Sequence, residues 1–159
     1  MLSEQILKEL RDFVEASRDV RLYDLHKEEP LISDAMYANE LEMFIEMHHS
    51  ASFSERLFQH IDELGLTDAS VYKTAGVDRK LFSKIRSIPD YKPSKRTVVA
   101  LCLSMKLAEE GTVDMLNAAG FSLSNNDRFD LVIQFCLEKE IYDIDEVNQA
   151  LYSLGLKPL

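Results

Sequence analysis

A cluster of cationic side chains in the middle of the chain has the residue types needed to bind phosphate groups. Between positions 68 and 96 the basic residues are Lys73, Arg79, Lys80, Lys84, Arg86, Lys92, Lys95 and Arg96. The acidic residues of this stretch are Asp68, Asp78 and Asp90, so its net charge is +5. The whole chain carries −10, which leaves −15 for the remainder. Because salt screens charges over about 8–10 Å, this basic segment can attract an anion independently of distant acidic residues.

Histidines and cysteines elsewhere do not form a pattern that indicates a metal site. His48, His49 and His60 lack a ligand spacing such as His-Glu-x-x-His, and no cysteine lies near them in the sequence. Surface histidines are therefore the better interpretation. Cys102 and Cys136 fall within helical patterns, and we expect them to be buried as small hydrophobic residues rather than joined in a disulfide framework.

Acidic residues also fail to form a recognisable reactive centre. Asp143, Asp145 and Glu146 lack the glycine and the final glutamate of a calcium-binding loop, and helix capping explains them. The sequence contains no glycine-rich phosphate loop and no serine-nucleophile motif. We therefore expect a protein that is not an enzyme and that uses no cofactor and no metal.

Two short predicted helices and the turn between them position the cationic cluster. The pattern predicts helices over 68–75 and 79–87. Thr67 and Asp78 are the expected N-caps, because their side-chain oxygens can accept bonds from free backbone amides. Gly76 is expected to end the first helix. This arrangement is typical of a helix-turn-helix.

Apolar residues at helical spacing throughout the chain predict an all-α fold. A domain at 51–159 is expected to contain five helices around the helix-turn-helix and two further C-terminal helices. The predicted opening residues outside the helix-turn-helix are Ser52, Ser94, Thr112, the 124–127 segment and Asp143. Leu64 is expected on the buried face of the first of these helices. Aromatic residues at helical spacing are also expected in the core: Phe121, Phe129, Phe135, Tyr142 and Tyr152.

Residues 1–50 read as a separate acidic helical arm. One helix is predicted around Ile6–Val14 and a second over 34–48 with Ser33 as its N-cap, joined by a loop from Arg18 to Ser33 that contains Pro30. These helices either pack on the main domain or form a dimer surface. Methionines near Met36, Met43 and Met47 suit core packing, and an adaptable surface for a protein partner is the alternative.

The stretch from Ser52 to Gly120 resembles the Cro and lambda-repressor-like helix-turn-helix family. The resemblance rests on Phe53–Leu57, Gly65–Thr67, Ala75–Val77, Asp78–Arg86 and Lys92–Ser94. A closer resemblance, through 78–86, Tyr91–Lys95, Phe129-Asp130 and Ile141–Asp143, is to a helical module of Gram-positive bacteria that follows some macro-domain proteins and also occurs alone. The 50 residues before the domain are too few for a macro domain, so we expect no ADP-ribose chemistry.

This resemblance implies a set of DNA-contacting residues on and around the third helix. The helix would lie in the major groove, where Arg79, Lys80 and Ser83 would contact base edges. The remaining cations would hold phosphates: Lys73, Lys84, Arg86, Lys92, Lys95 and Arg96. Two residues depart from the family pattern. Asp68 stands where a phosphate-binding glutamine is common, and Asp78 stands where a short neutral residue is usual.

Two functions from different classes follow. The first is a non-enzymatic transcriptional regulator that binds double-stranded DNA as a homodimer, because one short helix reads few base pairs. The N-terminal arm or the last two helices would supply the dimer interface. The second is a protein-interaction or adaptor module that keeps the helix-turn-helix fold without binding DNA. Asp68, Asp78 and the acidic surroundings favour it. The sequence shows neither a secretory signal nor an apolar run long enough to span a membrane, so we expect a cytoplasmic protein.

Overall fold

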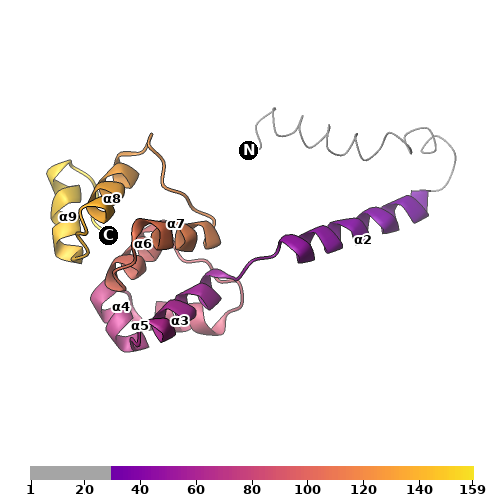
Figure 1. Cartoon of the computed structure of the whole chain (residues 1–159), viewed down its shortest axis with the longest axis horizontal. Coiled ribbons are helices and arrows are strands. Elements are labelled where there is room, and N and C mark those ends of the chain that lie inside the picture. The colour runs from indigo at the N-terminus through magenta and orange to yellow at the C-terminus, as the bar shows by residue number, and fades with distance from the viewer. Residues whose placement is uncertain (1–29) are drawn as a thin grey trace. The chain divides into compact units, whose positions relative to one another are not determined.

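The computed structural model describes residues 30–159, which are helical and contain no strand within that range (Figure 1). The chain divides into two compact units, residues 1–49 and residues 50–159. The all-α prediction is therefore confirmed for the described part. The predicted helix around residues 6–14 lies outside it, as does most of the predicted loop that follows.

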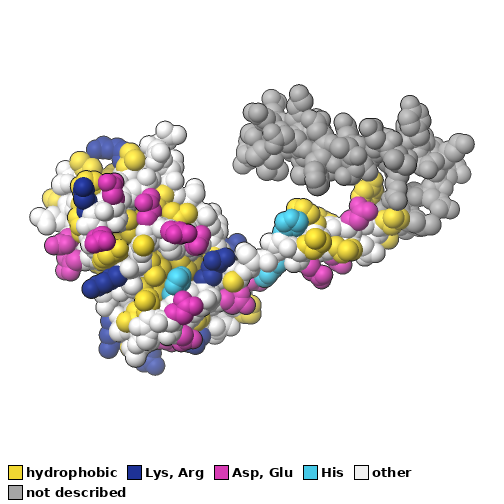
Figure 2. Space-filling model, in the orientation of Figure 1, with side chains coloured by type: hydrophobic (Ala, Val, Ile, Leu, Met, Phe, Trp, Pro, Cys, Tyr) yellow, Lys and Arg dark blue, Asp and Glu magenta, His cyan; other side chains and the backbone are white. Residues whose placement is uncertain are grey.

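The first unit contributes one long described helix, α2, which spans Pro30–His48. The prediction that this helix begins after an N-cap at Ser33 is wrong, because Ser33 itself lies within α2. Proline is tolerated at the start of a helix, since the first backbone N–H groups have no partner within the helix anyway. Apolar side chains of α2 are exposed, among them Leu41, Phe44 and Met47 (Figure 2).

The second unit is built from seven helices in the predicted order. Their bounds are α3 Phe53–Glu63, α4 Asp68–Ala75, α5 Arg79–Ser87, α6 Lys95–Ser104, α7 Glu109–Ala118, α8 Arg128–Glu138 and α9 Ile144–Ser153. Helix α6 lies at the centre, in contact with α4, α7 and α9, and α8 packs against α9. The first five of these helices cover the segment for which a helix-turn-helix bundle is predicted, and the last two follow it.

Capping side chains set most of these helix boundaries. Ser52 and Glu55 form a reciprocal capping box at α3, with bonds of 3.2 Å from the Glu55 N–H to Ser52 Oγ and 2.7 Å from the Ser52 N–H to Glu55 Oε2. Thr67, Asp78 and Asp127 accept bonds from the first amides of α4, α5 and α8. The predicted caps Ser94 and Asp143 do the same for α6 and α9. Local hydrogen bonding therefore fixes where these helices begin, as predicted.

Helix α7 is the exception, because it begins at Glu109 rather than at the predicted Thr112. Its N-cap position is Ala108, which offers no side-chain acceptor. Thr112 is completely buried inside the helix, where its hydroxyl donates to the backbone oxygen of Leu107 at 3.4 Å. A threonine hydroxyl can find a hydrogen-bond partner within a helix as well as at its start. The presence of a threonine therefore did not mark the start of α7.

The core is organised on α6, in which every side chain from Val98 to Leu103 is buried. A helix that is apolar on all sides must be surrounded by other helices. Three predicted core residues lie outside this core, because Leu64, Phe135 and Tyr152 are exposed. Leu64 follows the last residue of α3 at its C-cap, while Phe135 and Tyr152 lie on the outer sides of α8 and α9. The other three aromatic residues of the predicted set, Phe121, Phe129 and Tyr142, pack partly buried against the core.

Both cysteines are buried and free, as predicted. Burial raises the pKa of the Cys102 thiol from 9.0 to about 12, an effect that a hydrogen bond with Thr112 partly offsets. Burial also raises the pKa of Cys136. The described helices include none that is long and apolar enough to cross a membrane.

Replacing Leu101 with alanine should lower the free energy of unfolding by about 2–5 kcal/mol, because the substitution leaves a cavity beside α6. Leu101 is 0% exposed, whereas Leu64 is 48% exposed. Leu64→Ala is therefore the matched control and should change stability by no more than about 0.5 kcal/mol. Urea unfolding followed by circular dichroism measures both effects, and equal losses in the two variants would contradict a core centred on α6.

Alkaline pH should weaken the contribution of Cys102 to stability. Between pH 9 and 12 the unfolded thiol releases a proton that the folded thiol keeps, so the contribution is complete below pH 9 and declines as the pH rises. The stability difference between the wild type and Cys102→Ala should then shift by up to about 1.4 kcal/mol per pH unit. Urea unfolding on both sides of pH 9 tests this, and a difference that does not depend on pH would contradict it.

Candidate nucleic-acid interface

The turn between α4 and α5 is built from residues close in sequence. Gly76 adopts a left-handed conformation with φ 67° and ends α4. The Val77 N–H then donates to the backbone oxygen of Tyr72 at 2.8 Å, which closes the C-terminus of α4. Asp78 follows in an extended conformation, and its side chain accepts from the Lys80 N–H at 3.2 Å. The unusual aspartate at this position is therefore the N-cap that starts α5.

Helix α5 has a buried apolar side and an exposed polar side. Phe82 and Ile85 are buried against the core. The opposite side exposes Arg79, Lys80 and Ser83, the three residues predicted to contact bases, together with Lys84. Residues at these spacings share one face of a helix. The structure therefore brings the predicted base-contacting set together on the solvent side of α5, where none of its cations has an ion-pair partner within the described part of the chain.

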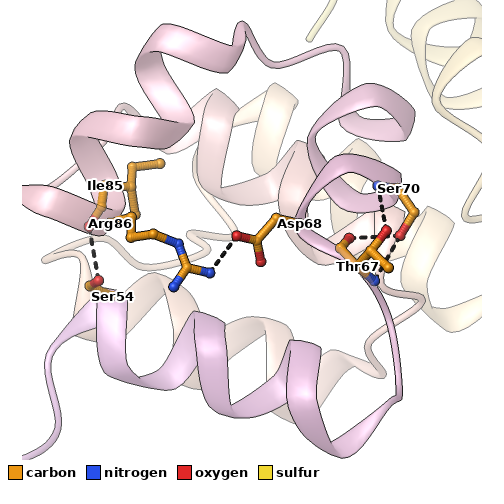
Figure 3. Close-up of polar contacts among 6 residues, drawn as sticks. All are labelled: Ser54, Thr67, Asp68, Ser70, Ile85 and Arg86. Atoms are coloured by element: carbon orange, nitrogen blue, oxygen red, sulfur yellow. Dashed lines mark hydrogen bonds and ion pairs between the residues drawn. The ribbon is translucent and has the colours of Figure 1, made fainter.

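Arg86, at the C-terminal end of α5, is oriented differently because it has partners inside the domain. Its guanidinium donates to the Asp68 carboxylate at the start of α4 (Figure 3). The same guanidinium lies 3.9 Å from the ring centroid of Phe58 on α3, in a cation–π contact. Ser54 of α3 donates to the backbone oxygen of Ile85 at 2.9 Å, also at this end of α5. Arg86 and its neighbours thus connect α3, α4 and α5.

This ion pair gives Asp68 a structural role. The resemblance leads to the expectation of a phosphate-binding side chain at this position, and the structure places the Arg86 cation against the Asp68 carboxylate. The two charges compensate each other, so the pair adds no net charge to the surface of α4 and α5.

Lys95 and Arg96, at the start of α6, also have intramolecular partners. Lys95 Nζ lies 2.5 Å from Oδ1 of Asp130, a carboxylate that is only 2% exposed. The other Asp130 oxygen accepts from the Ser124 N–H at 2.8 Å. Arg96 donates to the backbone oxygens of residues 157 and 158 at 2.7 and 2.8 Å, and its guanidinium lies 4.4 Å from the centroid of the Phe129 ring.

These contacts give the Phe129-Asp130 pair a physical role. Each residue receives one cation from the start of α6, so the pair holds the N-terminal ends of α6 and α8 together. The pair and the two cations are both recognised in the sequence. They are more than thirty positions apart, and that spacing gives no indication that the cations contact the pair.

Of the predicted phosphate-contacting residues, Lys73, Lys84 and Lys92 are exposed and have no ion-pair partner in the described residues. Lys73 also lines a pocket of about 660 Å³ near the start of α9. The charged residues of its lining are Lys73, Lys106, Glu140, Asp143, Asp145 and Glu146. Asp143 accepts from the Asp145 and Glu146 N–H groups and so caps α9, as its sequence context predicts.

Histidines and acidic residues in the described range do not gather into a group of three or more that could hold a metal ion. The His48 ring lies against Phe44, with ring centroids 4.0 Å apart, and its Nδ1 bonds the Phe44 backbone oxygen at 2.8 Å.

No protein-family model, curated protein sequence or solved structure matches this chain. The resemblance to the Cro and lambda-repressor-like family therefore stays an expectation.

The two lysines at positions 92 and 95 should differ sharply in their effect on stability. Lys95→Met removes the cation beside a buried carboxylate, so the free energy of unfolding should fall by about 1–3 kcal/mol. Lys92→Met, at an exposed position without an ion pair, is the matched control and should stay within about 0.5 kcal/mol of the wild type. Chemical unfolding measures both, and similar effects in the two variants would contradict a structural role for Lys95.

Proposed function

We propose that this chain is a non-enzymatic DNA-binding transcriptional regulator, acting as a homodimer, in which α5 enters the major groove. The observation that carries the proposal is the charge of α5. The helix has four basic residues and no acidic residue in a chain of net charge −10. Three of those cations, Arg79, Lys80 and Lys84, lie on its exposed face.

The division of the cations between two environments refines the proposed contacts. Arg79, Lys80 and Ser83 are the proposed base-contacting residues. Arginine can donate two hydrogen bonds to guanine, and a serine hydroxyl can bond either a donor or an acceptor on a base edge. Lys73, Lys84 and Lys92 are the proposed phosphate contacts. The ion-paired or hydrogen-bonded cations Arg86, Lys95 and Arg96 are assigned instead to holding the helices in place.

The local roles of the two unusual aspartates support this proposal. The Asp78 carboxylate is the N-cap of α5 and accepts from the Lys80 N–H, a contact that contributes about 1 kcal/mol to helix stability. Asp68 is neutralised by Arg86. The charge of Asp68 is therefore compensated by a cation, and the charge of Asp78 lies at the positive end of the α5 dipole.

A second candidate is the adaptor module without DNA binding, and one observation favours it. The outer side of α8 exposes Leu131 and Phe135, and Leu154 is exposed directly after α9. These side chains are 44%, 53% and 47% exposed. Large exposed apolar side chains grouped on one surface are typical of protein interaction sites. A partner protein could use this surface whether or not α5 contacts DNA.

DNA binding should depend on the exposed face of α5 rather than on overall charge. Duplexes selected from a random pool should bind the full chain in fluorescence anisotropy, with a log–log salt slope of about −0.9 per neutralised phosphate. Lys84→Ala should reduce the magnitude of that slope by about 0.9. Arg79→Ala should weaken binding to the selected duplex by about 1–3 kcal/mol and relax its specificity.

A matched pair of double variants separates local from global electrostatics. Lys80→Glu/Lys84→Glu should abolish binding. Lys106→Glu/Lys157→Glu changes the net charge equally at exposed positions outside α5, and it should leave most of the affinity intact. Equal losses in the two variants, or no binding of any duplex at low salt, would refute the proposal and leave the adaptor function.

A further inference from the structure

The exposed side of α8 carries a symmetric pattern of side chains. Arg128, Leu131, Phe135 and Glu138 are exposed and follow one another at intervals of three, four and three residues. Such positions form a single stripe along a helix. Ile133, near the middle of the helix, is completely buried on the opposite side. The stripe therefore has an apolar centre, a positive end at the start of α8 and a negative end at its last residue.

A shallow apolar groove runs beside this stripe. It has a volume of about 370 Å³ and lies between α8 and α9, where its apolar lining includes Leu131, Val132, Phe135 and Leu154. Hydrophobic side chains are visible at the surface over these two helices in Figure 2. Lys139 Nζ lies 5.9 Å from the centroid of the Phe135 ring, and Phe135 is still 53% exposed. Grooves of this kind accept the apolar face of another helix.

We propose that α8 of a second copy of this chain packs antiparallel on this stripe and forms the homodimer interface. In an antiparallel pair centred at the level of Ile133, Leu131 of one copy lies against Phe135 of the other. Arg128 of one copy then lies against Glu138 of the other, and the two-fold axis repeats both contacts. A two-fold interface requires a self-complementary surface of this kind, and the intervals of the stripe are the same in both directions.

The placement of the two charges supports the antiparallel direction. Arg128 is the first residue of α8 and Glu138 is the last. Within its own helix each charge lies near the end of like sign of the helix dipole, which is unfavourable. An antiparallel partner helix presents its negative C-terminal end to Arg128 and its positive N-terminal end to Glu138. The arrangement that buries the apolar centre therefore also places each charge beside the end of opposite sign of the partner helix dipole, which offsets the repulsion within its own helix.

This inference deepens the proposed function, because it rests on the homodimer that DNA recognition by one short helix requires, and it names the surface. The interface uses an 11-residue helix and the neighbouring end of α9, which places it among small interfaces. We therefore expect a concentration-dependent equilibrium between monomer and dimer, which does not require DNA.

The test is the mass of the full chain in solution without DNA, measured by sedimentation equilibrium over a wide range of concentrations. The wild type should approach twice the chain mass of 18.2 kDa. Phe135→Glu should remain at 18.2 kDa, with circular dichroism confirming its fold. Tyr152→Glu is the matched control, because Tyr152 is 81% exposed and belongs neither to the stripe nor to the groove lining. It should dimerise like the wild type.

Charge reversal tests the direction of packing with variants that leave the apolar centre unchanged. Arg128→Glu alone and Glu138→Arg alone each place like charges together and should raise the dimer dissociation constant about tenfold or more. The double variant Arg128→Glu/Glu138→Arg should restore it to within a few-fold of the wild type. A double variant as weak as the single ones would overturn the antiparallel arrangement.

A wild type that stays monomeric at every concentration would overturn the proposal and leave the groove to a different protein. A dimer that persists in Phe135→Glu would overturn it in favour of another dimer surface. Anisotropy with the selected duplexes is measured separately on the same variants. Failure of the mass test is therefore distinguishable from failure of DNA binding, since a monomer with an intact α5 can still bind DNA nonspecifically.

Discussion

The burial of α6 is the constraint on which the rest of the second unit depends. Six consecutive side chains, from Val98 to Leu103, are removed from water, and a helix can hide all of its faces only if other helices surround it. Helices α4, α7 and α9 supply that cover. Since α4 is fixed against α6, the turn at Gly76 and the cap at Asp78 determine the direction of α5 relative to α4. The position of α5 in the unit is thus a consequence of how α6 is covered.

Electrostatic pairing divides the cations of the basic segment into two groups. Arg86, Lys95 and Arg96 each meet a carboxylate, a carbonyl or an aromatic ring within the domain. Those contacts join α3 to α4 and α5, and α6 to α8 and the C-terminal tail. The cations on the exposed face of α5 have no such partner among the described residues. A cation without an internal partner keeps its charge available to a ligand, so the same segment serves both packing and the proposed recognition of phosphate.

The two proposed surfaces have different physical characters. The face of α5 is polar and positive, and it would interact with DNA mainly through charges that salt screens. The stripe on α8 is apolar at its centre with one charge at each end, and it would interact mainly through burial of hydrophobic area. Placing the two on different helices allows a dimer to form without covering the cations. Attraction over a screening length depends on local charge rather than on the net charge of the chain, so the proposed DNA contact through α5 is compatible with an acidic chain.

Hydrogen bonding between near neighbours made much of this protein predictable from its residues. The caps at Ser52, Thr67 and Asp78 satisfy amides only two or three positions away, so their helices begin where the pattern indicates. The same rule misplaced α7, because Thr112 satisfies its hydroxyl inside the helix instead. The all-α class and the exposed face of α5 likewise follow from local periodicity. The partners of Arg86, Lys95 and Arg96, and the exposure of Phe135, depend on contacts between segments far apart in the chain. Periodicity shows that a helix has an apolar side, but only the packing of the other helices decides which apolar residues are covered and which charges are paired.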